Sequence, residues 1–238
     1  MNPSTFALGP APAPSAARFA AAARPRRHQI PLWLKLGFTA FIAVWLPVYW
    51  FNYGPTNFLY FCDMALLLTL AGLWTENRLL VSMPAVGILI PQAVWVVDFC
   101  AQLSGHHLTG MTAYMFDSHR SLFLRGLSFF HGWLPFVLIF LVAKLGYDRR
   151  AFLGWTMLAW AACLVSFFFL PPAGAHLLDP KTPININYVF GLDDAAPQKL
   201  LPAVAYLATW MAVLLGLVFV PTHLVLRRFF APKTQTSN

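Results

Sequence analysis

Three side chains that can carry out chemistry stand in otherwise apolar segments of this sequence. Cys62 and Asp63 are adjacent near the start of one segment, and His131 lies about ten residues into a later one. A cysteine attacks a carbonyl carbon as its thiolate, and an imidazole can take the thiol proton. Asp63 or Asp98 can orient that imidazole, as the third residue of a catalytic triad does. The pattern predicts acyl-transfer chemistry, with Cys62 as the nucleophile and His131 as the base.

Further polar residues predict a pocket around this catalytic set. Asp98 lies near the end of an apolar segment. Ser128 precedes His131 by three residues, which places Ser128 and His131 on the same side of a helix. Asn185, Asn187 and Tyr188 lie in a polar loop whose amides and phenol can face a headgroup or an oxyanion. A loop hydrated by water explains the same loop residues, so both interpretations stay open.

The histidines raise the alternative of a metal site. Five histidines, Asp63 and Asp98 contain enough ligands for tetrahedral zinc. No H-x-x-x-H or H-E-x-x-H spacing places two of them on one helix face, so the predicted site contains no metal ligand and no cofactor. A metal-dependent hydrolase stays as a third alternative. The five histidines are His106, His107, His119, His131 and His176.

Composition defines the class of protein. The 238 residues are 59% hydrophobic and 10% charged, with a mean hydropathy of +0.63, whereas a soluble domain is about 25% charged. These values exclude a soluble enzyme, a disulfide-rich secreted module and a disordered chain. They predict an all-α, polytopic membrane protein.

Six apolar segments are predicted to span about 30 Å of hydrocarbon. They make up one transmembrane domain over residues 29–228, preceded by a Pro/Ala-rich basic tail (1–28) and followed by a short tail (229–238). The segments are Ile30–Trp50, Asn57–Trp74, Leu79–Leu103, Leu122–Leu145, Ala151–Leu170 and Leu200–Leu226.

Charges in the connecting segments predict the orientation. With a cytoplasmic N-terminus, twelve Lys and Arg residues lie inside and four lie outside, namely Arg120, Arg125, Lys181 and Lys199. Because cytoplasmic loops carry the excess of Lys and Arg, both termini are predicted to face the cytoplasm. The same bias explains the net charge of +8, so nothing calls for nucleic acid as a partner. We expect a multi-pass protein of the bacterial cytoplasmic (inner) membrane with lipids as its partners.

Three short motifs occur in order on these segments: Asn57-Phe-Leu-Tyr-Phe-Cys62-Asp, Ser128-Phe-Phe-His131-Gly132 and Asn185-Ile-Asn187-Tyr188. In this order they resemble the bacterial YwaF-like integral membrane proteins. That family is similar to a eukaryotic transmembrane acyltransferase that acts on ether phospholipids with a Cys and a His. It is also distantly similar to the androgen-induced membrane hydrolases, which use a Thr and a His.

The resemblance covers roughly residues 30–228 and implies Cys62 as nucleophile, His131 as base, and Asn187 and Tyr188 near the site. The leading hypothesis is therefore a lipid-directed acyltransferase or ester hydrolase with a pocket open to the outer leaflet. The alternative is a non-enzymatic membrane protein that binds or transports a small ligand or assembles with a partner. In that case the polar residues form a structural network.

Overall fold

The computed structural model describes residues 29–106, 108–179 and 181–230, and every regular element in these residues is a helix. The predicted all-α class is confirmed. The predicted tail 1–28 lies outside the described residues, as do residues 231–238. The last helix reaches Phe230, two residues past the predicted end of the transmembrane domain. The elements are α1 (Leu32–Tyr53), η2 (Pro55–Leu59), α2 (Phe61–Thr75), α3 (Arg78–Leu103), η3 (Ala113–Met115), α4 (Leu122–Ser128), α5 (Phe130–Leu145), α6 (Arg150–Phe169), η4 (Ile186–Tyr188), α7 (Ala203–Val213), η5 (Leu214–Phe219) and α8 (Val220–Phe230).

Five helical segments among the described residues are long and apolar enough to cross a membrane, not the six that were predicted. Two of them contain more than one element: α4 and α5 follow each other across Phe129, and α7 continues through the π-helical η5 into α8. The five are Leu32–Tyr53, Arg78–Leu103, Leu122–Leu145, Arg150–Phe169 and Ala203–Phe230.

The predicted second span is the one that falls short. Gly54 ends α1 with a positive φ of 79°, which glycine adopts without strain, and Pro55 then starts the 3-10 turn η2. Residues 57–59, which were predicted to belong to the second span, lie in this turn, so α2 has only 15 residues. At about 1.5 Å per residue it is roughly 22 Å long, less than the about 30 Å of a hydrocarbon core.

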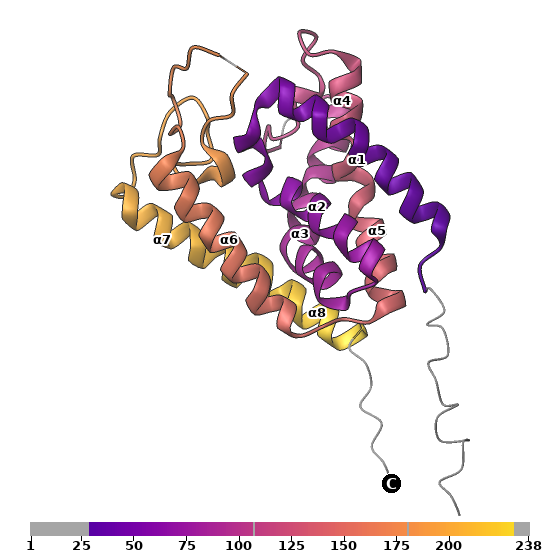
Figure 1. The fold of residues 1–238 in the computed structure, drawn as a ribbon. Coiled ribbons are helices and arrows are strands. Elements are labelled where there is room, and N and C mark those ends of the chain that lie inside the picture. The colour runs from indigo at the N-terminus through magenta and orange to yellow at the C-terminus, as the bar shows by residue number, and fades with distance from the viewer. Residues whose placement is uncertain (1–28, 107, 180, 231–238) are drawn as a thin grey trace, which may run out of the picture.

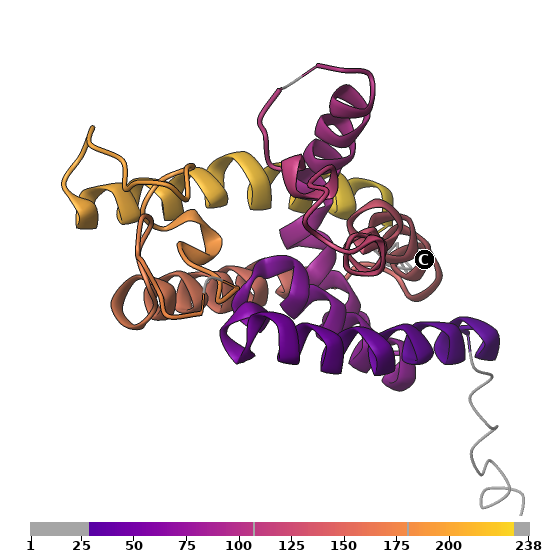
Figure 2. The same ribbon diagram turned by 90° about the horizontal axis from the view of Figure 1, so that it is seen from above.

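Helix α3 lies at the centre of the packing. It contacts α2, α5, α6 and α8, as Figures 1 and 2 show from two directions. Two glycines allow the closest approaches: Gly72 of α2 lies against Val81, and Gly87 of α3 lies against the ring of Trp155 from α6. Small residues at helix contacts are typical of membrane helices, where packing rather than the hydrophobic effect drives association.

Hydrogen bonds between distant segments define one end of the bundle, which we call the basal end. Glu76, in the α2–α3 turn, accepts from Lys35 Nζ near the start of α1 at 2.7 Å. The backbone N–H of Tyr147, between α5 and α6, donates to the carbonyl of Phe230 at the end of α8 (2.9 Å). These segments lie together at the lower right of Figure 1, and the three helical turns η2, η3 and η4 belong to loops at the opposite end.

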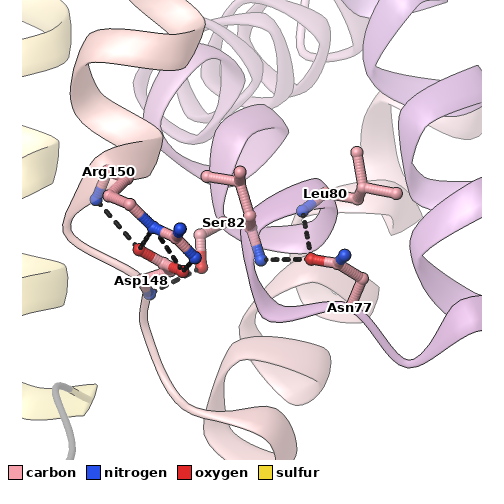
Figure 3. Close-up of polar contacts among 6 residues, drawn as sticks. Asn77, Leu80, Ser82, Asp148 and Arg150 are labelled. Carbon is pink, nitrogen blue, oxygen red and sulfur yellow. Dashed lines mark hydrogen bonds and ion pairs between the residues drawn. The ribbon is translucent and has the colours of Figure 1, made fainter.

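The link between α5 and α6 is fixed to the start of α3, as Figure 3 shows. Ser82 Oγ accepts from the Asp148 backbone N–H at 3.0 Å, while the Asp148 carboxylate accepts from the Arg150 guanidinium at 2.7 Å. The hydrogen bonds from Arg150 hold the pKa of Asp148 below its usual range. Asn77 caps α3 by accepting from Leu79 and Leu80. Side-chain hydrogen bonds therefore fix the turns at the basal end.

We predict that Glu76→Gln lowers the melting temperature at neutral pH. Burial raises the pKa of Glu76, but bonds from Lys35 and from the backbone of Gln29 and Ile30 outweigh it and lower this pKa from 4.5 to about 2. A lowered folded-state pKa stabilises the fold above pH 4.5, and this stabilisation is lost as the pH falls toward 2. Thermal unfolding in detergent across this pH range is the test. The difference in melting temperature between wild type and Glu76→Gln must shrink on acidification, and a constant difference contradicts a stabilising ionised Glu76.

Candidate functional site

Cys62 and Asp63 lie in the first turn of α2 and form a hydrogen-bonded chain with Asn57. The Cys62 thiol donates to Asp63 Oδ1 at 3.6 Å, and Asn57 Nδ2 donates to the other carboxylate oxygen. Asp63 is 2% exposed, while Cys62 is half-buried. The Asp63 carboxylate is therefore the middle member of the chain and binds both Asn57 and Cys62.

His131 contacts its own helix and α3. Its Nδ1 shares a hydrogen bond of 2.8 Å with the Ser128 carbonyl, so this nitrogen carries the proton and Nε2 keeps a lone pair. The ring stacks on Trp95 of α3, with centroids 5.1 Å apart and planes 20° apart. Among the described residues, no hydrogen bond joins His131 to Cys62. The structure therefore does not assemble the predicted Cys62–His131 pair directly.

Ser128 connects His131 to two tyrosines that the sequence analysis did not select. The Ser128 hydroxyl hydrogen-bonds the Tyr49 hydroxyl from α1 at 2.6 Å. Tyr114, from the outer loop, lies close to Ser128 and accepts from Trp95 Nε1 at 3.2 Å. Tyr49 is one of seven tyrosines in the sequence, and no spacing signals its partner.

Asn187 fixes the loop before α7 to the start of α2. Its Oδ1 accepts from the backbone N–H of Phe61 at 3.1 Å, and its Nδ2 donates to the carbonyl of Leu59 at 2.8 Å. The predicted proximity of Asn187 to Cys62 is thus a feature of the structure, although both amide atoms bind backbone. The loop turns sharply here, since Asn185, Asn187 and Tyr188 all have positive φ.

Asn185 forms hydrogen bonds within the loop, whereas Tyr188 lies nearer than Asn185 to the Cys62 thiol. Asn185 accepts from the Phe190 N–H and donates to the Gly191 carbonyl and to Asp194. The Tyr188 phenol is close enough to Cys62 and Asp194 for their charges to act on it. Burial, more than these charges, raises the pKa of Tyr188 to about 12. The phenol is therefore a neutral hydrogen-bond donor beside the cysteine.

Asp98 anchors the loop after α3. Its Oδ1 accepts from the backbone and hydroxyl of Thr109 and from the Gly110 N–H, and its Oδ2 accepts from the backbone and hydroxyl of Thr112. The side chain is 1% exposed. It borders a hollow on α3 lined mainly by apolar side chains, but its oxygens already have partners. These contacts hold the loop after α3 to the end of that helix.

Gln92 is a polar residue that sequence reasoning missed. It lies three residues before Trp95 on α3, and its side chain is 2% exposed. Neither its amide nitrogen nor its amide oxygen has a hydrogen-bond partner within the described residues. A buried amide without partners costs free energy, so it is a candidate for binding a polar group of a ligand. Its single occurrence in an apolar run is the signal that could have identified it.

The candidate metal ligands do not gather. Within the described residues, no group of three or more His, Cys, Asp or Glu side chains is placed to hold one ion. His107 lies outside the described residues. Asp63 and Asp98 each bind neighbouring protein groups instead, the first Asn57 and Cys62 and the second the Thr109–Thr112 loop.

The fold and these residues define a helical protein with membrane-compatible helices and a set of buried polar side chains near one end. Comparison with known proteins adds no relative: no protein-family model, curated protein or solved structure matches the chain.

Proposed function

We propose that this chain is a membrane-embedded acyltransferase or ester hydrolase that acts on lipids, with Cys62 as its nucleophile. The observation that carries the proposal is the hydrogen-bonded chain Asn57–Asp63–Cys62 at the start of α2. A thiol needs a neighbouring base to become nucleophilic, and the base needs a group that orients it. Asp63 and Asn57 fill these two positions.

In the proposed mechanism, Asp63 takes the thiol proton and the Cys62 thiolate attacks the ester carbonyl carbon. The tetrahedral intermediate collapses, the carbon–oxygen bond breaks, and Asp63 returns the proton to the departing alkoxide. Water or a second alcohol then loses its proton to Asp63 and attacks the thioester. The thiolate leaves and is reprotonated, which completes hydrolysis or transfer without any redox change.

In this proposal His131 is not the base for Cys62, which is the role that the sequence predicted for it. Its Nδ1 is engaged by Ser128, and the protein places Asp63, not His131, at the thiol. We propose that His131, which stacks on Trp95, and Gln92, three residues before Trp95 on α3, bind the polar part of the substrate. The neutral Tyr188 phenol is the proposed donor to the oxyanion.

A membrane lipid is the proposed substrate because the polar residues lie among helices covered by apolar side chains. Large exposed hydrophobic residues occur on α1, α3, α5, α6 and α8, and the surface has few charges to keep it in water. A substrate that enters from the bilayer reaches the start of α2 without crossing the protein surface through water.

We also propose the orientation: six passes with both termini in the cytoplasm of a bacterial cell and the η2, η3 and η4 loops outside. The basal end joins the start of α1, the α2–α3 turn and the end of α8, so α2 runs between the two ends of the bundle although it is short. Neighbouring segments and local thinning accommodate such a helix. The basal end also carries most of the loop arginines, as the positive-inside rule requires.

The test is acylation of the purified protein in detergent by the p-nitrophenyl ester of a fatty acid. We expect a hydroxylamine-sensitive thioester on Cys62, absent in Cys62→Ala and formed roughly 10²–10⁴-fold more slowly in Asp63→Asn, the usual range for losing a general base. Cys100→Ala and Cys163→Ala are matched controls, because Cys100 is exposed on α3 and Cys163 is buried on α6. Unchanged acylation and lipid turnover in both Cys62→Ala and Asp63→Asn overturn the proposal.

One observation favours the non-enzymatic alternative: Asn185, Asn187 and Asp98 bind mainly backbone and loop groups, so part of the polar set is structural. If Asp63 is structural as well, Asp63→Asn lowers stability by about 1–3 kcal/mol and leaves lipid turnover unchanged. Thermal unfolding and turnover measured on the same preparation separate the two functions.

A further inference from the structure

The basal end carries positive charge that the protein does not neutralise. All eight acidic residues of the chain lie within the described residues, and only Glu76 and Asp148 belong to the basal end. Both form ion pairs, with Lys35 and Arg150 respectively. Within the described residues no ion pair involves the remaining basal cations, and neither terminal tail contains an Asp or Glu that could supply one. These cations are Arg78, Lys144, Arg149, Arg227 and Arg228.

Two of these arginines converge on one histidine from different parts of the chain. Arg227 follows His223 by four residues, one turn along α8. Arg149, in the α5–α6 link, lies two residues after Tyr147, whose hydroxyl hydrogen-bonds His223 Nδ1 at 2.6 Å. Both arginines are exposed, while His223 is half-buried against Phe152, with ring centroids 4.9 Å apart. Like charges repel, so this arrangement favours an anion between them.

The backbone around this group is held in place. The Tyr147 hydroxyl and His223 Nδ1 share a hydrogen bond of 2.6 Å, and the Tyr147 N–H donates to the Phe230 carbonyl. Asp148, between Tyr147 and Arg149, is fixed by Ser82 and Arg150, as Figure 3 shows. When the Tyr147 hydroxyl donates to Nδ1, the ring proton of His223 is on Nε2, which can then donate to a ligand.

We propose that Arg149, Arg227 and His223 bind the phosphate of an anionic phospholipid headgroup at the basal end. A guanidinium presents paired N–H donors that match phosphate oxygens, and an imidazole N–H adds a third donor. The α8 residues beside Arg227 support a lipid rather than a free phosphate, because Leu224, Val225 and Phe229 are between 53% and 72% exposed. These side chains form an apolar surface for the acyl chains next to the charged site.

The test measures lipid binding to the intact detergent-purified chain by native mass spectrometry and by the change in melting temperature. We expect phosphatidylglycerol, but neither phosphatidylcholine nor inorganic phosphate, to remain bound and to raise the melting temperature. The Arg149→Gln/Arg227→Gln variant should bind phosphatidylglycerol roughly thirtyfold more weakly, at about fivefold for each arginine near a membrane surface. The matched control is Arg78→Gln/Lys144→Gln, which removes the same charge from the same end.

Three results overturn the proposal. Equal losses in the site variant and in the control show diffuse attraction to the membrane rather than a site. Equal binding of phosphatidylglycerol and phosphatidylcholine by the wild-type chain shows no headgroup selection, and this measurement needs no variant to fold. Stabilisation by inorganic phosphate alone shows that the site takes a soluble anion instead. His223→Gln should weaken phosphatidylglycerol binding without changing net charge at neutral pH, which separates recognition from general electrostatics.

Discussion

Replacing Gly87 by alanine is expected to destabilise the protein more than any other single-methyl change in the bundle. A Cβ atom at this position would lie 1.8 Å from Trp155 Cε2 and 2.0 Å from its Nε1. Trp155 is fully buried between α3 and α6, so the ring has no free space to move into. Overpacking in a core costs about 1–3 kcal/mol, occasionally more, and an overlap of this size places Gly87→Ala at the upper end. Thermal unfolding in detergent measures the loss.

A control for the alanine itself is available on α1. A Cβ atom at Gly37 would have no other heavy atom within 4 Å, so Gly37→Ala should leave the melting temperature nearly unchanged. Combining Gly87→Ala with Trp155→Leu should recover part of the lost stability, because the smaller side chain removes the overlap. Equal melting temperatures for Gly87→Ala and Gly37→Ala would show that α3 and α6 do not pack as closely as the structure has them.

The helical class was predictable because it depends on composition and on long apolar runs. Five of the six predicted segments lie within a few residues of membrane-compatible helices, whose ends are set by proline, glycine and charged residues. The second segment was overestimated because hydropathy does not distinguish a helix from a 3-10 turn. The Gly54-Pro55 pair carried the information that α1 ends there and that α2 starts only at Phe61.

The contacts of the candidate site were much less predictable. Cys62 and His131 are each notable in the sequence, but sequence order does not tell which group a side chain will bond. His131 bonds the carbonyl of Ser128, three residues earlier on its own chain, and Cys62 bonds the residue next to it. Local partners of this kind compete with the long-range pair that the spacing of motifs favours.

The contact of Asn57 with Asp63 could not be predicted from the sequence either. It was visible as the first residue of a motif, yet its role depends on the turn η2, which brings its amide back to Asp63 six residues later. Helical periodicity would place these two residues on different faces. The geometry of an irregular turn decides the contact, and no pattern of period two or 3.6 reports it.

Replacing Asp98 by alanine is expected to release the loop after α3. Five donors from Thr109, Gly110 and Thr112 share this one carboxylate, and Thr112 is fully buried. A buried donor left without a partner costs roughly 1–3 kcal/mol. The Thr112 N–H loses its partner, while the Thr112 hydroxyl keeps Gln102 Oε1 at 3.2 Å. We therefore expect a loss of about 1–3 kcal/mol for Asp98→Ala and a smaller loss for Asp98→Asn, which keeps one acceptor.

Hydrogen exchange distinguishes loop release from general destabilisation. The amides of Thr109, Gly110 and Thr112 should exchange much faster in Asp98→Ala, while amides in the middle of α3 keep their protection. Asp117→Ala is the matched control in the same loop, because Asp117 only caps a turn at His119 and forms a partly exposed ion pair with Arg120. If both variants exchange alike, Asp98 does not hold the loop, and its carboxylate becomes free to serve the ligand role that the sequence suggested. If only Asp98→Ala exchanges faster and acylation at Cys62 continues, the outer loop is structural and the chemistry lies with α2.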